Sequence, residues 1–171
     1  LRGSFTEEEF NGYKESIKQY GDPGIVMVDD LRFCTNPCAE IGFIPINPRT
    51  GNTCWSFCNL NEINGGACTT KEKFFEACEN AAILETLQAS YTDMPFLGSD
   101  TKELIELESL IGVSITGIMD NPQVFINAET LQAGAKIVNE TNEKIAKLIG
   151  INPAARTTTV KPSGNASVLL Q

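Results

Sequence analysis

Histidine is absent from this sequence of 171 residues. Histidine is the commonest general base in enzymes and the commonest metal ligand. Its absence excludes the Ser-His-Asp and Cys-His types of hydrolase from the chemistry that this chain can perform by itself. Acid–base catalysis would therefore depend on carboxylates, lysines, tyrosines or thiols.

Long apolar runs are also absent. No run approaches the roughly 18 residues of a membrane-spanning helix, and the first residues, LRGSFTEEEF, do not have the pattern of a secretory signal peptide. We therefore expect no membrane association and a cytoplasmic location. The chain begins with leucine and stops within SVLLQ, so we expect it to be a piece of a longer protein.

Basic residues are in the minority, with 13 Lys and Arg against 22 Asp and Glu and a net charge of −9. A nucleic-acid-binding surface would be basic, so we expect no nucleic acid as a partner. A nucleotide substrate is compatible with this charge because it needs only a local phosphate site. The apolar content of 42% is ordinary for one globular domain.

The six cysteines have two regular spacings. Cys34 and Cys38 are separated by three residues, as are Cys54 and Cys58, and this resembles the spacing of four-thiolate zinc sites. The inserts favour another interpretation, because the second pair encloses Trp-Ser-Phe, which is better suited to a strand. We keep a zinc-binding structural module as an alternative and assign no metal ligand. A disulfide framework is not expected without a secretory signal.

Periodicity and capping residues predict helices that alternate with short extended segments. The expected helices cover residues 5–20, 69–91, 100–110 and 128–149. The expected strands cover residues 25–28, 31–46, 54–60 and 112–118, with another in TTTV at 157–160. This alternation predicts an α/β fold with largely parallel strands.

Three helix starts and one helix end carry specific predictions. Thr69 with Glu72 should form a capping box, Asp100 with Glu103 should cap the next helix, and Asn127 should cap the last one, which Gly150 ends. Within the second helix, one face should be buried. Its expected members are Phe75, Cys78, Ala82 and Leu87.

The stretch CTNPCAEIGF places Asn36, Cys38 and Glu40 at alternate positions. In an extended chain, alternate side chains share one face, so these three groups would stand in a row. Pro37 favours an extended conformation because it restricts its own φ and that of Asn36. Each residue also has a purely structural interpretation. Asn36 would be a turn residue, Cys38 a small buried hydrophobe and Glu40 a solvated charge.

The stretch KPSGNAS, residues 161–167, places hydroxyl groups and a glycine between a predicted strand and a predicted helix start. Hydroxyls and free N–H groups at such a turn form an anion site, and phosphate is its usual occupant. If KPSGNAS is considered by itself, an ordinary turn is a commoner explanation than an anion site.

In order along the chain, NPCAEI, FCNLNEI, GVSITGIMD and KPSGNAS resemble the large catalytic chain of ribonucleotide reductases. The variant looks most like the adenosylcobalamin-dependent class, and GDPGIVMVDD is similar to the segment that leads into its finger loop. The resemblance covers nearly the whole chain. It implies that residues 1–171 form part of a ten-stranded α/β barrel of the ribonucleotide reductase and glycyl radical enzyme type. The finger loop would cover about 34–46 and the phosphate-binding turn about 161–167.

The resemblance also implies roles for individual residues. Cys38 would carry a thiyl radical that removes the 3′-hydrogen of the ribose. Glu40 would accept the 3′-OH proton, and Asn36 would hydrogen-bond the ribose hydroxyls. Cys58 would be one of two reducing thiols, with its partner N-terminal to this chain. The substrate phosphates would bind to Ser163, Gly164, Asn165, Ala166 and Ser167.

The implied reaction is the reduction of a ribonucleoside di- or triphosphate to a 2′-deoxyribonucleotide for DNA synthesis. Adenosylcobalamin would bind mostly outside this chain, and a thioredoxin-like or other dithiol would supply electrons. The rest of the reductase chain would be a necessary partner, so the fragment alone should be inactive. An inactive remnant that retains only nucleotide binding stays open as a second alternative.

Overall fold

The computed structural model describes residues 6–22 and 24–170, and it divides into two units, 1–33 and 34–171. The first unit contains helix α1, Glu7–Tyr20, as predicted. Thr6 accepts a hydrogen bond from the Glu9 N–H while the Glu9 carboxylate accepts one from the Thr6 N–H, which is a capping box. Gly21 ends α1 with a φ of 80°, a conformation that glycine adopts without strain.

Residues 25–28 form no strand, so the prediction there was wrong. Ile25, Val26 and Met27 are 40, 50 and 60% exposed. The prediction used a short apolar run alone. Such a run becomes a strand only where a neighbouring strand satisfies its backbone groups, and the described part of the first unit offers none.

The second unit is built on a parallel pair of strands, β3 (Asn59–Asn64) and β4 (Ile111–Thr116). Their register runs from Asn59 opposite Ile111 to Asn64 opposite Thr116. The predicted strand at 157–160 is reduced to a parallel bridge between Thr158 and Val113, on the other edge of β4. β4 therefore lies between β3 and this bridge. The parallel pairing of β3 with β4 agrees with the alternation predicted from the sequence, whereas a closed barrel stays a prediction.

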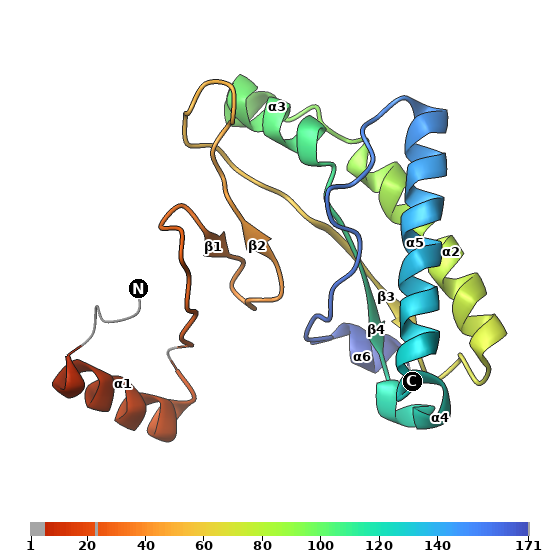
Figure 1. The fold of residues 1–171 in the computed structure, drawn as a ribbon, viewed down its shortest axis with the longest axis horizontal. Coiled ribbons are helices and arrows are strands. Elements are labelled where there is room, and N and C mark those ends of the chain that lie inside the picture. The colour runs from red at the N-terminus through yellow and green to blue at the C-terminus, as the bar shows by residue number, and fades with distance from the viewer. Residues whose placement is uncertain (1–5, 23, 171) are drawn as a thin grey trace. The chain divides into compact units, whose positions relative to one another are not determined.

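Helices connect these strands in two β-α-β crossovers (Figure 1). Between β3 and β4 lie α2 (Lys71–Ala89), η1 (Pro95–Leu97) and α3 (Gly98–Glu108). After β4 follow η2 (Ile118–Asp120), α4 (Pro122–Phe125), α5 (Ala128–Ile149) and α6 (Ala166–Leu169). α2 contacts both strands, and α5 packs along α2. No helix in the described ranges is long and apolar enough to cross a membrane.

The core lies where α2, α5 and the sheet meet. Phe74 packs edge-on against Phe125 with ring centroids 5.2 Å apart. Gly134 lets α5 approach Phe74 from another direction, because a Cβ there would lie 2.6 Å from the Phe74 ring. Cys78 is buried as predicted, but Leu87 is 43% exposed and its predicted burial was wrong. The buried face of α2 is rotated from the predicted one and includes Phe74, Cys78, Ala81, Ala82, Glu85, Thr86 and Ala89.

Two of the four predicted helix ends are confirmed, namely the Asn127 cap and the Gly150 end of α5. The capping box at Thr69 was wrong, because Thr70 is the extended residue whose hydroxyl accepts from the Lys73 N–H. The predicted cap at Asp100 was also wrong. α3 begins at Gly98, and the Asp100 carboxylate instead accepts hydrogen bonds from the loop at 47–52.

Candidate functional site

The CTNPCAEIGF stretch folds as a tight loop and not as one extended strand. Short strands β1 (Cys34–Thr35) and β2 (Gly42–Phe43) pair antiparallel on either side of it. Within the loop, the Ala39 N–H donates to the Asn36 carbonyl at 2.9 Å, and the Ile41 N–H donates to Asn36 Oδ1 at 3.0 Å. Ala39 adopts a φ of 61°. Asn side chains stabilise such turns by bonding nearby N–H groups, and here that local bonding outweighs the extended preference of Pro37.

The three predicted site residues therefore do not stand in a row. Asn36 is half-buried and lines a groove, Glu40 is half-buried and lines a smaller cavity, and Cys38 is exposed on the outside of the loop. Cys38 lies in the same loop as Asn36 and Glu40, but the loop directs it to solvent.

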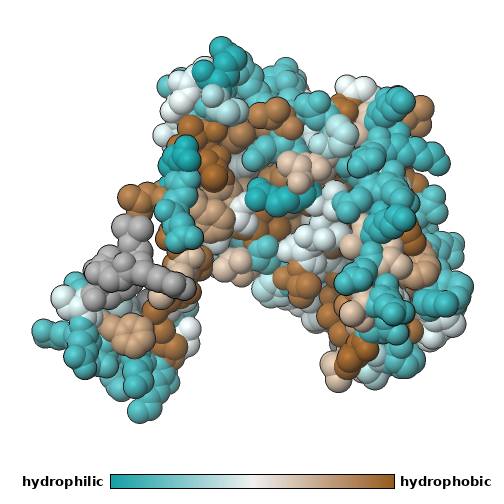
Figure 2. Space-filling model, in the orientation of Figure 1, coloured by the Kyte–Doolittle hydropathy of each residue, from teal (hydrophilic) through white to brown (hydrophobic). Residues whose placement is uncertain are grey.

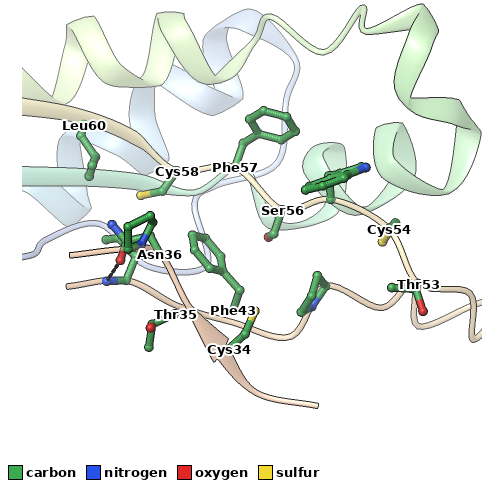
Figure 3. Close-up of a pocket in the computed structure, with 14 residues that line it drawn as sticks. Cys34, Thr35, Asn36, Phe43, Thr53, Cys54, Ser56, Phe57, Cys58 and Leu60 are labelled. Atoms are coloured by element: carbon green, nitrogen blue, oxygen red, sulfur yellow. Dashed lines mark hydrogen bonds between the residues drawn. The ribbon is translucent and has the colours of Figure 1, made fainter. Parts of the chain in front are cut away.

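The groove has a volume of about 660 Å³ and is lined by residues of the 34–60 segment. In Figure 3, Cys58 and Asn36 lie at one end of the groove, whereas Cys54 and Thr53 lie at the other. Figure 2 shows brown, apolar side chains on the same unit, over the segments between β2 and β3. The predicted strand at 54–60 was wrong for residues 54–58, since β3 begins only at Asn59.

Cys58 also lines a cavity of about 60 Å³ together with Glu40 and Arg156. Burial, together with the charge of Glu85, raises the pKa of the Cys58 thiol to about 12, while Arg156 acts in the opposite direction. Cys58 is therefore a protonated thiol at neutral pH. The Oε2 atom of Glu40 is buried without a hydrogen-bond partner, which leaves it available to accept a proton or a hydrogen bond.

The segment before KPSGNAS is bonded to the loop. The Thr159 hydroxyl donates to the Glu40 carbonyl at 3.0 Å, across 119 positions of sequence. The Lys161 N–H donates to the Ser114 hydroxyl of β4 at 3.1 Å. These bonds bring the first and the last of the four sequence motifs to one side of β4.

Glu62 is a site residue that the sequence analysis missed. Its carboxylate accepts hydrogen bonds from Thr116 and Lys161, and from the Ser163 hydroxyl at 2.7 Å. Burial raises the pKa of Glu62, but the bonds from Lys161, Thr116 and Ser163 outweigh burial and lower it. The alternation of Cys58, Leu60 and Glu62, which puts them on one face of an extended segment, was the signal that could have identified it.

The predicted phosphate-binding turn is largely bonded to the chain itself. Ser163 donates to Glu62, Ser167 donates to the Gly164 carbonyl at 2.7 Å, and the Ala166 N–H donates to the Ser163 carbonyl at 3.2 Å. Gly164 takes a φ of 54°, which suits glycine. Asn165 precedes the four-residue helix α6 without a side-chain cap bond. In this structure, the anionic group bound to the turn is the carboxylate of Glu62, through the Ser163 hydroxyl.

Glu85 is a second residue that the sequence analysis missed. It is 1% exposed, and its Oε2 atom accepts from the Gly112 N–H at 2.8 Å. Its Oε1 atom is buried with no hydrogen-bond partner. Burial raises the pKa of Glu85 to about 8. The signal in the sequence was its position seven residues after Cys78, on the helix face that is buried.

The four-thiolate zinc alternative gains no support. Cys34 and Cys38 are exposed free thiols, and Cys54 and Cys58 lie at opposite ends of the groove. Within the described ranges, no three His, Cys, Asp or Glu side chains gather so that they could hold a metal ion.

The residues present also do not mark a cobalamin site. Three buried polar side-chain atoms lack a hydrogen bond in the described residues, on Glu40, Asn61 and Glu85, and none of these residues lines the 660 Å³ groove. The side chains that line the groove are apolar or neutral, so none of them offers a charge to the phosphate of such a cofactor.

No protein-family model matches the chain, and no solved structure matches it. A curated protein of Dictyostelium discoideum, named "Probable adenosylcobalamin-dependent ribonucleoside-triphosphate reductase", is 25% identical to it over 171 aligned positions. The alignment covers 91% of this chain and 22% of the relative, so the chain spans 22% of the length of that protein. At a general level, then, the chain is similar to a ribonucleotide reductase.

Proposed function

We propose that the protein containing this chain reduces ribonucleotides to 2′-deoxyribonucleotides by thiyl-radical chemistry. The observation that carries the proposal is the meeting of three distant motif segments. Glu40 is bonded to Thr159 across 119 positions, and Glu62 is bonded to Ser163 across 101 positions. A loop with a thiol and a carboxylate, the segment that leads into β3 with a second thiol, and a turn rich in hydroxyls thus meet around β4. The name of the Dictyostelium relative supports the same reaction.

In the proposed reaction, a thiyl radical at Cys38 removes the 3′-hydrogen of the ribose and becomes a thiol. Glu40 accepts the proton of the 3′-OH, and Asn36 holds the ribose hydroxyls in position. The 2′-OH leaves as water. The two reducing thiols, one of them Cys58, supply two electrons and become a disulfide. Overall, one ribonucleotide and two thiols give one deoxyribonucleotide, one disulfide and one water, and the radical returns to Cys38.

The surroundings of the residues suit these roles. Cys38 is exposed, so a substrate that binds over the loop can reach its sulfur. Within the described residues, Glu40 has a buried oxygen without a hydrogen-bond partner, so this oxygen is free to bond a substrate hydroxyl. Cys58 is held in the protonated state, and a thiol rather than a thiolate supplies both a hydrogen and an electron.

The substrate would bind its phosphates at Ser163, Gly164, Asn165, Ala166 and Ser167. Because Ser163 and the nearby Lys161 are bonded to Glu62, a phosphate would displace that carboxylate from them. The relative's name favours a ribonucleoside triphosphate as substrate over a diphosphate.

The remaining parts of the proposal extend beyond this chain. The two crossovers would form part of a ten-stranded α/β barrel, and adenosylcobalamin would bind elsewhere in the protein to generate the radical. A thioredoxin-like or other dithiol would reduce the disulfide after each turnover. The proposed compartment is the cytoplasm.

A thiol-mapping experiment on Cys58 tests the proposal. Cys54 is the control, because it lies four residues earlier and lines the same groove. Cys58→Ser in the full-length protein should abolish multiple turnover with a dithiol reductant, while Cys54→Ser should cost at most about 1 kcal/mol of stability and keep turnover. After one turnover of the wild-type protein, alkylation and peptide mapping should find Cys58 in a substrate-dependent disulfide. Finding Cys54 there would show that the redox site is misplaced, and the absence of nucleotide reduction would refute the function.

A further inference from the structure

Glu85 is a buried acid with no role in the chemistry proposed above. Its side chain enters the β3–β4 sheet from α2 and accepts the Gly112 N–H of β4 at 2.8 Å. Its other oxygen, Oε1, is buried and has no hydrogen bond of normal geometry within the described residues, although the backbone of Asn61 interacts with the carboxyl and lowers its pKa. A buried acceptor that lacks a donor costs about 1–3 kcal/mol, so its retention in the core calls for a physical reason.

Cys58 lies next to Gly112, the residue whose N–H donates a hydrogen bond to Glu85. A Cβ placed on Gly112 would come within 3.4 Å of Cys58 Sγ and within 2.4 Å of a Leu60 methyl group. A Cβ at this position would require the ends of the Leu60 and Thr159 side chains to move, so glycine lets the carboxyl of Glu85 and the thiol of Cys58 approach the same residue of β4. Within the described residues, the Cys58 thiol makes one weak hydrogen bond, to the Asn59 carbonyl at 3.7 Å.

We propose that Glu85 is a positioning residue that fixes β4 beside Cys58 and controls the protonation of that thiol. The proposal rests on the proposed function for the role of Cys58, but its physical content does not depend on turnover. Below its pKa of about 8, Glu85 is a neutral acid and does not perturb the thiol. Above it, the carboxylate adds a negative charge that disfavours the Cys58 thiolate. Cys58 is thereby kept as a thiol over a wide range of pH.

Other charged groups face Cys58 and must be distinguished from Glu85. They come from three further segments: Glu40 in the loop at 36–41, Glu108 at the end of α3, and Arg156 before the Thr158 bridge. Glu40 and Glu108 raise the pKa of Cys58, and Arg156 lowers it. Within this set, Glu85 is the carboxylate with the largest effect and the one whose raised pKa makes it ionise under mildly alkaline conditions.

The test measures the rate of iodoacetamide alkylation at single cysteines of the reduced full-length protein as a function of pH. In Glu85→Gln, the side chain keeps its shape but cannot ionise. Alkylation of Cys58 should match the wild type near pH 7 and become faster than the wild type above pH 8. The rate should rise roughly tenfold for each unit by which the pKa of the thiol falls. Equal rates at every pH would overturn the proposal.

Two other thiols serve as internal controls in the same digest. Cys54 should keep its wild-type rate, and Cys78, which lies in the core on α2 with a pKa raised to about 12 by burial, should stay unreactive. Faster alkylation of all three thiols would mean that the substitution loosens α2, and it would also overturn the proposal. The wild-type protein gives a test that needs no substitution. Its Cys58 rate should rise less steeply with pH around pH 8, where Glu85 ionises, and a uniform slope would contradict the proposal.

These outcomes are separable from failure of the proposed function. If the full-length protein does not reduce nucleotides but Glu85→Gln shifts the Cys58 profile, the reductase proposal fails and the control of the thiol stands. If nucleotides are reduced but Glu85→Gln leaves the alkylation profile of Cys58 unchanged, the reductase proposal stands and the control of the thiol by Glu85 fails.

Discussion

Cys38 and Cys58 are both free thiols, but their surroundings give them different chemistry. Cys38 is exposed on the loop at 36–41, whereas Cys58 is half-buried between a groove and a cavity, with a pKa raised to about 12. A radical carrier has to meet both its radical source and the substrate, and exposure permits this. A reducing thiol has to keep its hydrogen until the substrate is activated, and a raised pKa favours this.

Cys38→Ser in the full-length protein should abolish nucleotide reduction and leave the fold unchanged. The O–H bond of serine is too strong for the hydroxyl to carry the radical, while an exposed Cys-to-Ser change typically alters stability by less than about 0.5 kcal/mol. Turnover and thermal unfolding, measured together, check this. Cys34→Ser is the matched control, because Cys34 is also an exposed thiol and should keep turnover. Appreciable turnover in Cys38→Ser would exclude the radical role.

Glu40→Gln should slow the 3′-hydrogen step and leave substrate binding nearly unchanged. The amide keeps the shape of the side chain but cannot accept a proton, and general bases contribute roughly 10²–10⁴-fold to a rate. Turnover with 3′-deuterated substrate would show a larger isotope effect in the variant if this step has become limiting. Glu108→Gln is the control, since Glu108 also acts on Cys58 but does not line the cavity with Glu40. A Glu40→Gln protein with wild-type turnover would make Glu40 an ordinary charge.

At the scale of elements, a polar network fastens the loop at 47–52 to helix α3. Asp100 accepts from Asn47, Thr50 and Asn52, and Glu103 accepts from Asn47 and Arg49. Asn47 is 1% exposed, and both polar atoms of its side chain are hydrogen-bonded, because its Oδ1 atom also accepts the Arg49 N–H at 2.8 Å. This loop connects Pro45 to Thr53, two residues that line the groove, so the network fastens one part of the groove wall to α3.

Acidification should release this loop from α3. The hydrogen bond from Thr50 holds the pKa of Asp100 below 3.8, and the bond from Arg49 holds that of Glu103 below 4.5. A lowered pKa in the folded state stabilises the docked loop above these unfolded values, and the stabilisation is lost as the pH falls below them. Amide hydrogen exchange of residues 49–52, corrected for the intrinsic rate, should therefore accelerate below about pH 4.

Substitutions separate the network from general effects of acid. At pH 7, Asp100→Asn should already accelerate exchange in the loop. Glu106→Gln should not, because Glu106 faces Lys102 in an exposed pair on the same helix. An Asp100→Asn protein with wild-type exchange in the loop would show that the carboxylate does not hold the loop.

The sequence predicted the helices better than the strands, for a physical reason. Helix ends depend on nearby residues, so Asn127 and Gly150 could be identified directly. The strand predictions at 25–28 and 54–58 were wrong because a strand needs a partner that is often far away in sequence, and the residues of the segment itself do not reveal one. The Asp100 cap failed for a similar reason, since its carboxylate is bonded to residues about fifty positions earlier.

The candidate site shows the same division. The motifs resemble a known family but do not state which side chains meet, and the row of Asn36, Cys38 and Glu40 was wrong because the amide of Asn36 closes a turn. Glu62 and Glu85 escaped the analysis because their importance depends on partners from other elements: Lys161 and Ser163 for Glu62, and Gly112 for Glu85.

At the scale of the whole molecule, the 34–171 unit contains two successive β-α-β crossovers with β4 in the middle. Repetition of this unit with further strands on both edges would generate the barrel that we propose. Parallel strands are stable mainly when both faces are covered, and their edges invite further pairing. The bonds from Thr159 to Glu40 and from Ser163 to Glu62 then hold the loop and the last motif in place around β4.

Glu62→Gln tests whether the unit is held together by the same carboxylate that a phosphate would displace. The side chain of Glu62 is 5% exposed and that of Lys161 is 21% exposed, so their ion pair is shielded from solvent. Hydrogen bonds to charged groups contribute about 1.5–3 kcal/mol, and the variant should lose a stability of this order in denaturant unfolding at pH 7. The loss should vanish at low pH. Because Lys161, Thr116 and Ser163 lower the pKa of Glu62 despite its burial, its stabilisation is present above 4.5 and lost as the pH falls below that value.

The same variant should bind inorganic triphosphate more tightly than the wild type, because Lys161 and Ser163 no longer face a competing anion. Isothermal titration of the full-length protein measures this directly. Asp120→Asn is the matched control. Asp120 lines the same cavity as Lys161 and Ser163, but neither of them donates a hydrogen bond to it in the described structure, so the control should bind triphosphate like the wild type. Weaker or unchanged triphosphate binding in Glu62→Gln would mean that Glu62 only supports the fold, and that the substrate phosphates bind elsewhere than at residues 163–167.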